Sequence, residues 1–140
     1  MANVEVTQMR LVVDAADFEE AVGFYRDALG MRELESYSGE GGAEVMILDA
    51  GRATLELSNP AQIEFIDQVE VGERVAPHLR VAFEVADTRT ATQVAISAGA
   101  ELIAEPVETP WLSLNSRLDG PAGLQLTLFE ELDEQGTDEV

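Results

Sequence analysis

The sequence of 140 residues contains no cysteine, no lysine, and only one histidine and one tryptophan. Without cysteine it can form neither disulfides nor thiolate sites. The single histidine has no fixed partners in the sequence, which excludes a Ser-His-Asp arrangement. No apolar run approaches the ~20 residues that cross a bilayer. The start, MANVEVTQMR, lacks the basic and apolar regions of a signal peptide, so we expect a cytoplasmic protein.

Basic residues are also scarce. Eight arginines face 28 acidic residues, which gives a formal net charge of −20. A field of this sign repels phosphate backbones and anionic lipids, so we expect neither nucleic acid nor membrane as a partner. Residues 131–140, ELDEQGTDEV, are acidic with little apolar content, and we expect a flexible tail there.

The order of predicted elements occurs twice. In the first half, a strand around Arg10–Ala15 is followed by Asp17, which has the character of a helix N-cap with Glu20 completing a capping box. In the second half, a strand at 79–85 is followed by Asp87, a second N-cap. The other predicted strands are 32–38, 43–49, 52–58, 101–104, 112–118 and 123–129, and a short helix is expected near 62–70.

These elements predict an α+β fold made of two tandem βαβββ modules. Module one covers about 5–58, a connector covers 59–77 and module two covers about 78–129, all in one domain over 1–130. Each module is too small to close a core alone, so we expect a curled mixed sheet around a shared pocket. In the first strand Arg10 and Val12 alternate with Leu11 and Val13. The apolar face should pack on the helix, and the face with the charged residues should line the pocket.

The doubled unit resembles the vicinal oxygen chelate superfamily. The resemblance rests on DFEEAVGFYRDALGM in the first half, on LRVAFEVAD at the start of the second, and on DGPAGLQLTLFE near the end, and it covers about 7–129. Members include glyoxalases, extradiol dioxygenases, epimerases and antibiotic-binding resistance proteins. The resemblance therefore implies the fold and, because members commonly associate, a homodimer; it does not imply one reaction.

In enzymatic members, each module supplies two metal ligands, usually His or Glu. The resemblance places these four positions at Arg10, Glu56, Arg80 and Thr127. A guanidinium has no lone pair for a cation, and one carboxylate with one hydroxyl does not make a tight divalent site. We therefore expect no metal and no other cofactor. A shifted site built from His78, Glu56 and Glu84 is the alternative that would hold a metal.

The two arginines at matching strand positions suggest an anion site. Arg10 and Arg80 could bind a carboxylate or phosphate with paired hydrogen bonds; alternatively, they pair with Glu56, Asp14 and Glu84. Glu56 is a candidate general base or simply an ion-pair partner. The sole tryptophan is a candidate for stacking on an aromatic ligand, for a dimer contact or for core packing. The further candidate lining residues are Trp111, Asn115, Arg117, Thr127, Arg52 and Met46.

From these observations we predict a glyoxalase/bleomycin-resistance-like protein. It would bind a small organic molecule, without metal, in a cavity lined by Arg10, Glu56 and Arg80. One alternative is a metal-dependent lyase, isomerase or dioxygenase with an unorthodox site. A second alternative is a non-catalytic interaction protein whose pocket is filled by its own ion pairs.

Overall fold

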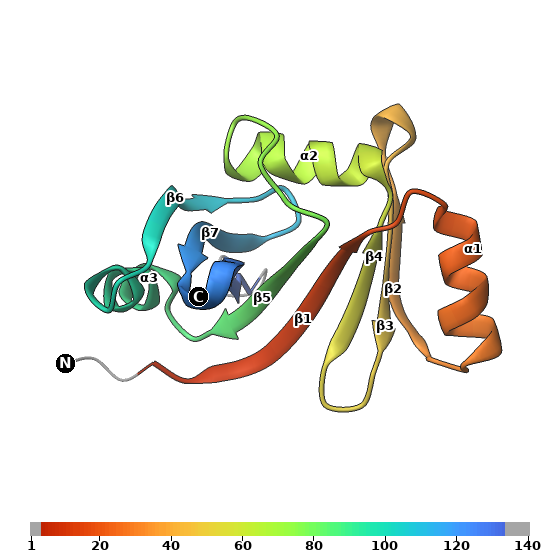
Figure 1. The fold of residues 1–140 in the computed structure, drawn as a ribbon, viewed down its shortest axis with the longest axis horizontal. Helices are drawn as coiled ribbons and strands as arrows, with labels where there is room; N and C mark the ends of the chain where they lie inside the picture. The colour runs from red at the N-terminus through yellow and green to blue at the C-terminus, as the bar shows by residue number, and fades with distance from the viewer. Residues whose placement is uncertain (1–3, 134–140) are drawn as a thin grey trace.

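A computed structural model describes residues 4–133 (Figure 1). Eight strands form one sheet in the order β2-β3-β4-β1-β5-β8-β7-β6. The strands are β1 (Val6–Asp14), β2 (Glu33–Ser38), β3 (Glu44–Asp49), β4 (Thr54–Ser58), β5 (Leu79–Val85), β6 (Glu101–Glu108), β7 (Ser113–Gly120) and β8 (Leu124–Glu131). The helices are α1 (Phe18–Val22), which continues as a π-helix (Gly23–Ala28), α2 (Pro60–Glu70) and α3 (Thr88–Ser97). The α+β fold of two βαβββ modules is therefore confirmed.

Helices α1 and α3 begin directly after the two aspartates that the sequence indicated as N-caps. The Asp17 carboxylate accepts a hydrogen bond from the Glu20 N–H at 3.1 Å, and Asp87 accepts one from the Thr90 N–H at 3.1 Å. Several elements begin or end a few residues from the expected bounds, and two strands extend further than expected. Strand β6 runs on to Glu108 because irregular pairing with β7 supports it further. Strand β8 runs to Glu131, so the acidic segment predicted from 131 begins inside a strand, and residues 134–140 lie outside the described part.

The two modules join through their first strands. Strands β1 and β5 pair antiparallel, with Arg10 opposite Ala82 and Val12 opposite Arg80. Each then pairs parallel with the last strand of its own module, which sets Val12 beside Glu56 and Ala82 beside Thr127. The four positions that the sequence marked therefore meet at the centre of the sheet.

The two faces of the sheet pack against different helices; the alternation predicted helix packing on the apolar face only, and α2 on the charged face was not expected. Helix α1 covers a cluster that includes Leu48 and Leu57, and α3 covers one that includes Leu118 and Leu128. On the opposite face, α2 buries Ile63 against Val12, Ala82 and Phe129. Figure 1 shows α1 and α3 at opposite ends of the molecule, with α2 crossing between the two halves. No helix of the described residues is long and apolar enough to span a membrane.

Helix α2 is attached to both modules. At its start, the Asn59 side chain donates to the Gly42 carbonyl at 2.7 Å and accepts from the Glu44 N–H at 3.0 Å, which binds the helix to module one. The same side chain caps α2 by accepting from the Gln62 N–H at 2.9 Å. The other end of the helix is bound to module two by buried charges.

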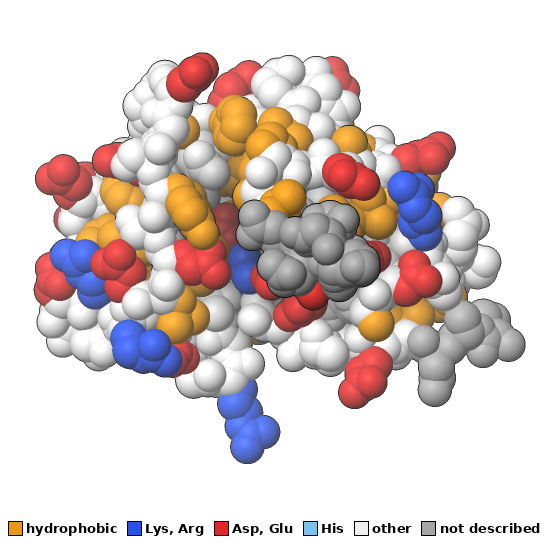
Figure 2. Space-filling model, turned by 180° about the vertical axis from the view of Figure 1, so that it is seen from behind, with side chains coloured by type: hydrophobic (Ala, Val, Ile, Leu, Met, Phe, Trp, Pro, Cys, Tyr) orange, Lys and Arg blue, Asp and Glu red, His pale blue; other side chains and the backbone are white. Residues whose placement is uncertain are grey.

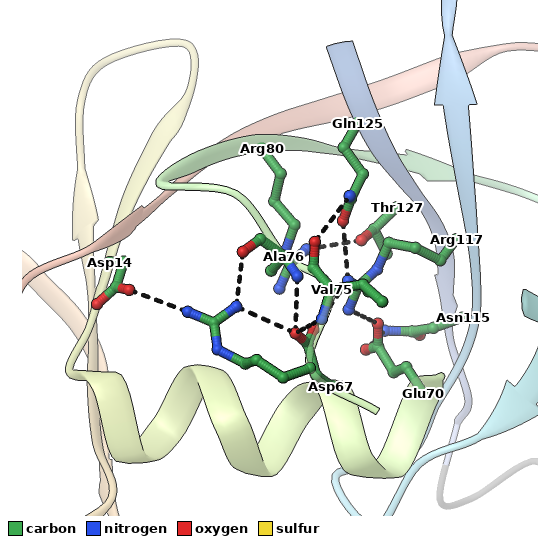
Figure 3. Close-up of polar contacts among 11 residues, drawn as sticks. Asp14, Asp67, Glu70, Val75, Ala76, Arg80, Asn115, Arg117, Gln125 and Thr127 are labelled. Carbon is green, nitrogen blue, oxygen red and sulfur yellow. Dashed lines mark hydrogen bonds and ion pairs between the residues drawn. The ribbon is translucent and has the colours of Figure 1, made fainter. Parts of the chain in front are cut away.

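Those buried charges centre on Arg117, whose side chain is fully buried on β7 (Figure 3). It donates to Asp67 at 2.9 Å, to Glu70 at 2.7 Å and to Gln125 at 3.0 Å. Asp67 also accepts from the backbone N–H groups of Val75 and Ala76, each at 2.8 Å. Burial opposes ionisation of Asp67, but these backbone donors and Arg117 outweigh it and hold its pKa below the ordinary value.

Arg74 extends this network to the other module. Its guanidinium contacts Asp67 at 3.3 Å and Asp14, at the end of β1, also at 3.3 Å. It donates to the Ala76 carbonyl at 2.6 Å as well. The connector after α2 is thus fixed between the helix and the centre of the sheet.

We predict that Arg117→Met lowers the free energy of unfolding by about 3–5 kcal/mol, because it leaves two carboxylates buried without their cation. Arg89→Met is the matched control, because Arg89 is exposed on α3 and its replacement should change stability by less than about 0.5 kcal/mol. Chemical denaturation of the three proteins measures both effects. Equal stability of the two variants would contradict the role given to Arg117.

Candidate functional site

A cavity of about 890 Å³ lies on the concave face of the sheet, roofed in part by α2. This volume is typical of sites for small organic molecules. Six of the residues singled out in the sequence line it: Arg10, Glu56, Arg80, Trp111, Asn115 and Thr127. The structure therefore brings together most of the predicted site.

Arg80 lies in the cavity wall almost without exposure, at 4%. Its Nη1 donates to the Thr127 hydroxyl at 2.6 Å, and its Nε has no hydrogen-bond acceptor. Among the described residues no carboxylate lies within ion-pair distance of it. Burial, together with repulsion from Arg117, lowers the pKa of Arg80 below its ordinary value. The cavity thus contains a buried cation that lacks a direct counter-ion.

Arg10 is already engaged by neighbouring groups. Its Nε donates to the Gln8 side chain at 2.6 Å, and its Nη2 pairs with Glu131 at 3.2 Å. Its guanidinium also lies 4.9 Å from the centre of the Phe129 ring, a cation–π distance. The two arginines that look equivalent in the sequence are therefore unequal, and Arg80 has the greater unused capacity for an anion.

Glu56 lines the same cavity as the two arginines, from the neighbouring strand β4, and is 8% exposed. Its contacts are long: 3.9 Å to Arg10 and 3.5 Å from the Ser58 hydroxyl. Burial raises the pKa of Glu56 above the ordinary carboxyl value, and Arg80 and Arg10 offset only part of that effect. A cavity carboxyl group whose pKa is raised can exchange a proton with a ligand more readily than an ordinary carboxyl group.

Large apolar side chains surround the mouth of the cavity. Tyr37, Phe65, Trp111 and Leu112 line it, and each is 40% exposed or more. The Trp111 and Phe65 rings lie 6.0 Å apart, and the Leu112 N–H closes a turn on the Thr109 carbonyl at 3.0 Å. Leu112 has φ of +63°, a strained conformation for a non-glycine residue. The exposure of Trp111 rules out the core-packing interpretation and leaves a ligand contact or a dimer contact.

Three predicted lining residues lie elsewhere. Arg117 is enclosed in the network beneath α2 and does not line the cavity. Met46 is buried against Leu48 and Leu57 on the α1 side of the sheet, because its register places it on the opposite face. Arg52 is exposed in the turn between β3 and β4. Of the expected ion-pair partners, Asp14 binds Arg74, and Glu84 pairs with neither Arg10 nor Arg80.

Sequence reasoning missed Phe65, Tyr37 and Phe129 in the lining. Phe129 could have been found, because alternation along β8 places it on the same face as Thr127. Phe65 and Tyr37 could not, since their positions depend on where α2 and the edge strand β2 pack in three dimensions.

The residues at the family's metal positions do not fit a divalent cation. Two of the four are guanidinium groups, and the Thr127 hydroxyl already accepts a hydrogen bond from Arg80. The alternative set of His78, Glu56 and Glu84 is not formed: His78 is exposed at the start of β5, and no group of three His, Asp or Glu able to hold a metal occurs among residues 4–133. This hypothesis was wrong because His78 precedes the part of β5 that reaches the cavity.

We predict that Glu56→Gln stabilises the protein increasingly as pH rises. A folded-state pKa above the ordinary value of 4.5 means that the stability of the native protein falls as pH rises from that value through the raised pKa. Glutamine does not ionise, so the variant does not lose this stability. The Tm of Glu56→Gln minus that of the native protein should therefore grow as pH rises through the raised pKa and then level off. Glu101→Gln, at an exposed position, is the matched control for the change of charge alone. A constant Tm difference for Glu56→Gln would contradict the prediction.

Comparisons with known proteins agree with this architecture. The model of the Glyoxalase/Bleomycin resistance protein/Dioxygenase superfamily matches residues 8–128. No curated protein matches the chain. A methylmalonyl-CoA epimerase from Mycobacterium tuberculosis superposes with a TM-score of 0.66 at 20% identity, over 98% of this chain and 96% of that one.

Two further structures extend the comparison. A mutant of 4-hydroxymandelate synthase from Streptomyces coelicolor has a TM-score of 0.60 at 22% identity, over 100% of this chain and 45% of that one. A superfamily member from Vibrio splendidus 12B01 has a TM-score of 0.58 at 14% identity, over 89% and 98%. At these identities the neighbours share the fold. The match over 8–128 shows that the chain belongs to the glyoxalase/bleomycin resistance protein/dioxygenase superfamily.

Proposed function

We propose that this protein binds a small organic anion without a metal. The carboxylate or similar anionic group of the ligand would contact the Arg80 guanidinium. The observation that carries the proposal is the state of Arg80, which is buried in the cavity wall with one hydroxyl partner and no ion pair. A buried charge is costly unless it is paired, so a ligand anion would supply the missing interaction. Arg10 would contribute less, because it is already bound to Glu131 and Gln8.

The ligand's remaining part would be apolar, and aromatic groups fit best. The deeper wall offers Val12, Ala82 and Phe129, and the mouth offers Trp111 and Phe65. Aromatic side chains give a flat ligand surfaces on which to stack. Thr127 and Asn115 would supply polar contacts near the anionic end.

The exterior charge does not oppose this proposal. Figure 2 shows acidic side chains scattered over the visible face, with few basic ones between them. Surface charges separated by more than about 8 Å are largely screened at physiological salt, whereas contacts inside a cavity are screened much less. The acidic exterior would therefore slow the approach of an anion more than it would weaken the bound state.

A matched set of probes tests the proposal by calorimetry: 3-phenylpropanoate, its amide and 3-phenylpropylamine. The carboxylate should bind, and the amide and amine should bind at least about 10-fold more weakly. Arg80→Met should lower affinity for the carboxylate by about 10-fold to 100-fold, and Arg10→Met by less.

The controls separate binding from folding. Arg89→Met, on the exposed face of α3, should leave affinity unchanged. Arg80→Met should keep or raise Tm, because it removes a buried cation with no ion-pair partner. If the amide bound as well as the acid, or if Arg80→Met kept full affinity, the proposal would fail. A protein that bound none of the probes would favour the interaction-protein alternative.

Glu56 supports a second candidate function, proton transfer to or from a bound acid. Its carboxyl group lines the cavity beside both arginines, and burial raises its pKa. In such a step the ligand C–H bond would break, the proton would go to the Glu56 carboxylate, and a solvent-derived proton would later return to carbon.

Phenylpyruvate in D₂O tests this candidate by proton NMR. The native protein should exchange the methylene protons faster than the protein-free background, and Glu56→Gln should reduce the rate to that background. Exchange that is equal in both proteins would exclude the proton-transfer role.

A further inference from the structure

Buried charges of both signs surround the cavity before any ligand arrives. Arg10, Arg80 and Arg117 lie near the largely buried carboxylates Glu56, Asp67 and Glu70. Arg10 also pairs with the more exposed Glu131, and Arg74 pairs with both Asp14 and Asp67, so the acids of this group already outnumber its arginines. The present inference rests on the proposed function: an anion bound at Arg80 would add a further negative charge near Glu56. Like charges in a poorly hydrated site repel each other, so binding should favour protonation of one carboxylate.

The three carboxylates differ in how firmly their ionised form is held. Asp67 accepts from two backbone N–H groups and from Arg117 and Arg74. Glu70 accepts from Arg117 and from Asn115, both at 2.7 Å. Glu56 has only the two long contacts at 3.5 Å and 3.9 Å. Protonation of Glu56 would therefore disrupt the fewest interactions.

The charged groups around Glu56 also indicate that this carboxyl group is the one that would be protonated. Arg10 faces it from β1 and Arg80 from β5, while Glu70 on α2 adds a like charge. Other titratable residues of the same cavity are Glu35, Tyr37, Glu40 and Glu131. Burial raises the pKa of Glu56, and the two arginines lower it by favouring the ionised carboxylate. A ligand anion that occupied Arg80 would weaken that support.

We propose that one proton enters the cavity with the ligand and binds to Glu56, so that the site selects monoanions over dianions. The ligand carboxylate then takes the place of the Glu56 charge beside the arginines, and the protonated Glu56 can donate a hydrogen bond to it. A dianion would bring a second charge, and the other buried carboxylates of the described residues, Asp67 and Glu70, are held ionised by closer hydrogen bonds than Glu56.

Calorimetry in buffers of different ionisation enthalpy tests the inference, from neutral to alkaline pH, with 3-phenylpropanoate and the dianion 2-phenylsuccinate. In the range where free Glu56 is ionised, the native protein should take up close to one proton per 3-phenylpropanoate, and affinity should fall about 10-fold per pH unit. 2-Phenylsuccinate should bind at least about 10-fold more weakly. Glu56→Gln should bind 3-phenylpropanoate with no proton uptake and with no dependence on pH in this range.

Glu131→Gln is the matched control, because it removes the other carboxylate that contacts Arg10 while leaving Glu56 in place. It should retain the proton uptake. Binding without uptake across the whole range, or equal uptake in Glu56→Gln, would overturn this inference and leave the anion site standing. If neither acid bound, the proposed function itself would fail.

Discussion

The contact between Arg117 and the two carboxylates of α2 is the interaction on which the cavity depends. Helix α2 lies within the connector and packs on the concave face of the sheet through Ile63. Asp67 and Glu70 lie on the side of α2 that faces the sheet, where Arg117 binds them. Two acidic residues could not be buried there without a cation that reaches them from β7. A buried ion pair adds little net stability compared with apolar packing, but it strongly disfavours any position of the helix that separates the charges. It therefore specifies where α2 lies.

The same network explains why two buried arginines on the same sheet have different roles. Arg117 donates three hydrogen bonds to side-chain oxygens, whereas Arg80 donates one, to a hydroxyl. Both leave Nε without an acceptor, so the difference lies in the terminal nitrogens. Asp67 and Glu70 are held by Arg117 and by their other donors, and they are thus withheld from Arg80. Among the described residues, Arg80 has no direct ion pair because Asp67 and Glu70 are bound by Arg117 and Glu56 lies beyond ion-pair distance.

The sequence carried most of the fold because its signals were local. Asp17 and Asp87 mark helix starts by their own hydrogen bonds, and the alternation of Arg10 with Leu11 assigns the faces of β1 without knowledge of other elements. The site was less predictable where a residue's role depends on a distant element. Asn115 and Arg117 share a strand face, yet one lines the cavity and the other lies beneath α2. Asp67 and Glu70, three residues apart on a helix, have the pattern of a solvated face. Nothing local shows that they pair with a buried arginine 50 and 47 residues later in the sequence.

The attachment of α2 at both ends has a geometric consequence. Its first residue follows a cap that is bound to module one, and its last turn is bound to module two, so the helix acts as a rigid spacer between the two halves of the sheet. Eleven residues at 1.5 Å each fix that spacing at about 16 Å. An inserted residue would lengthen the spacer and also rotate its acidic side by about 100°, away from Arg117. The number of residues in this single helix thus limits how far apart the two halves of the sheet are held beneath it.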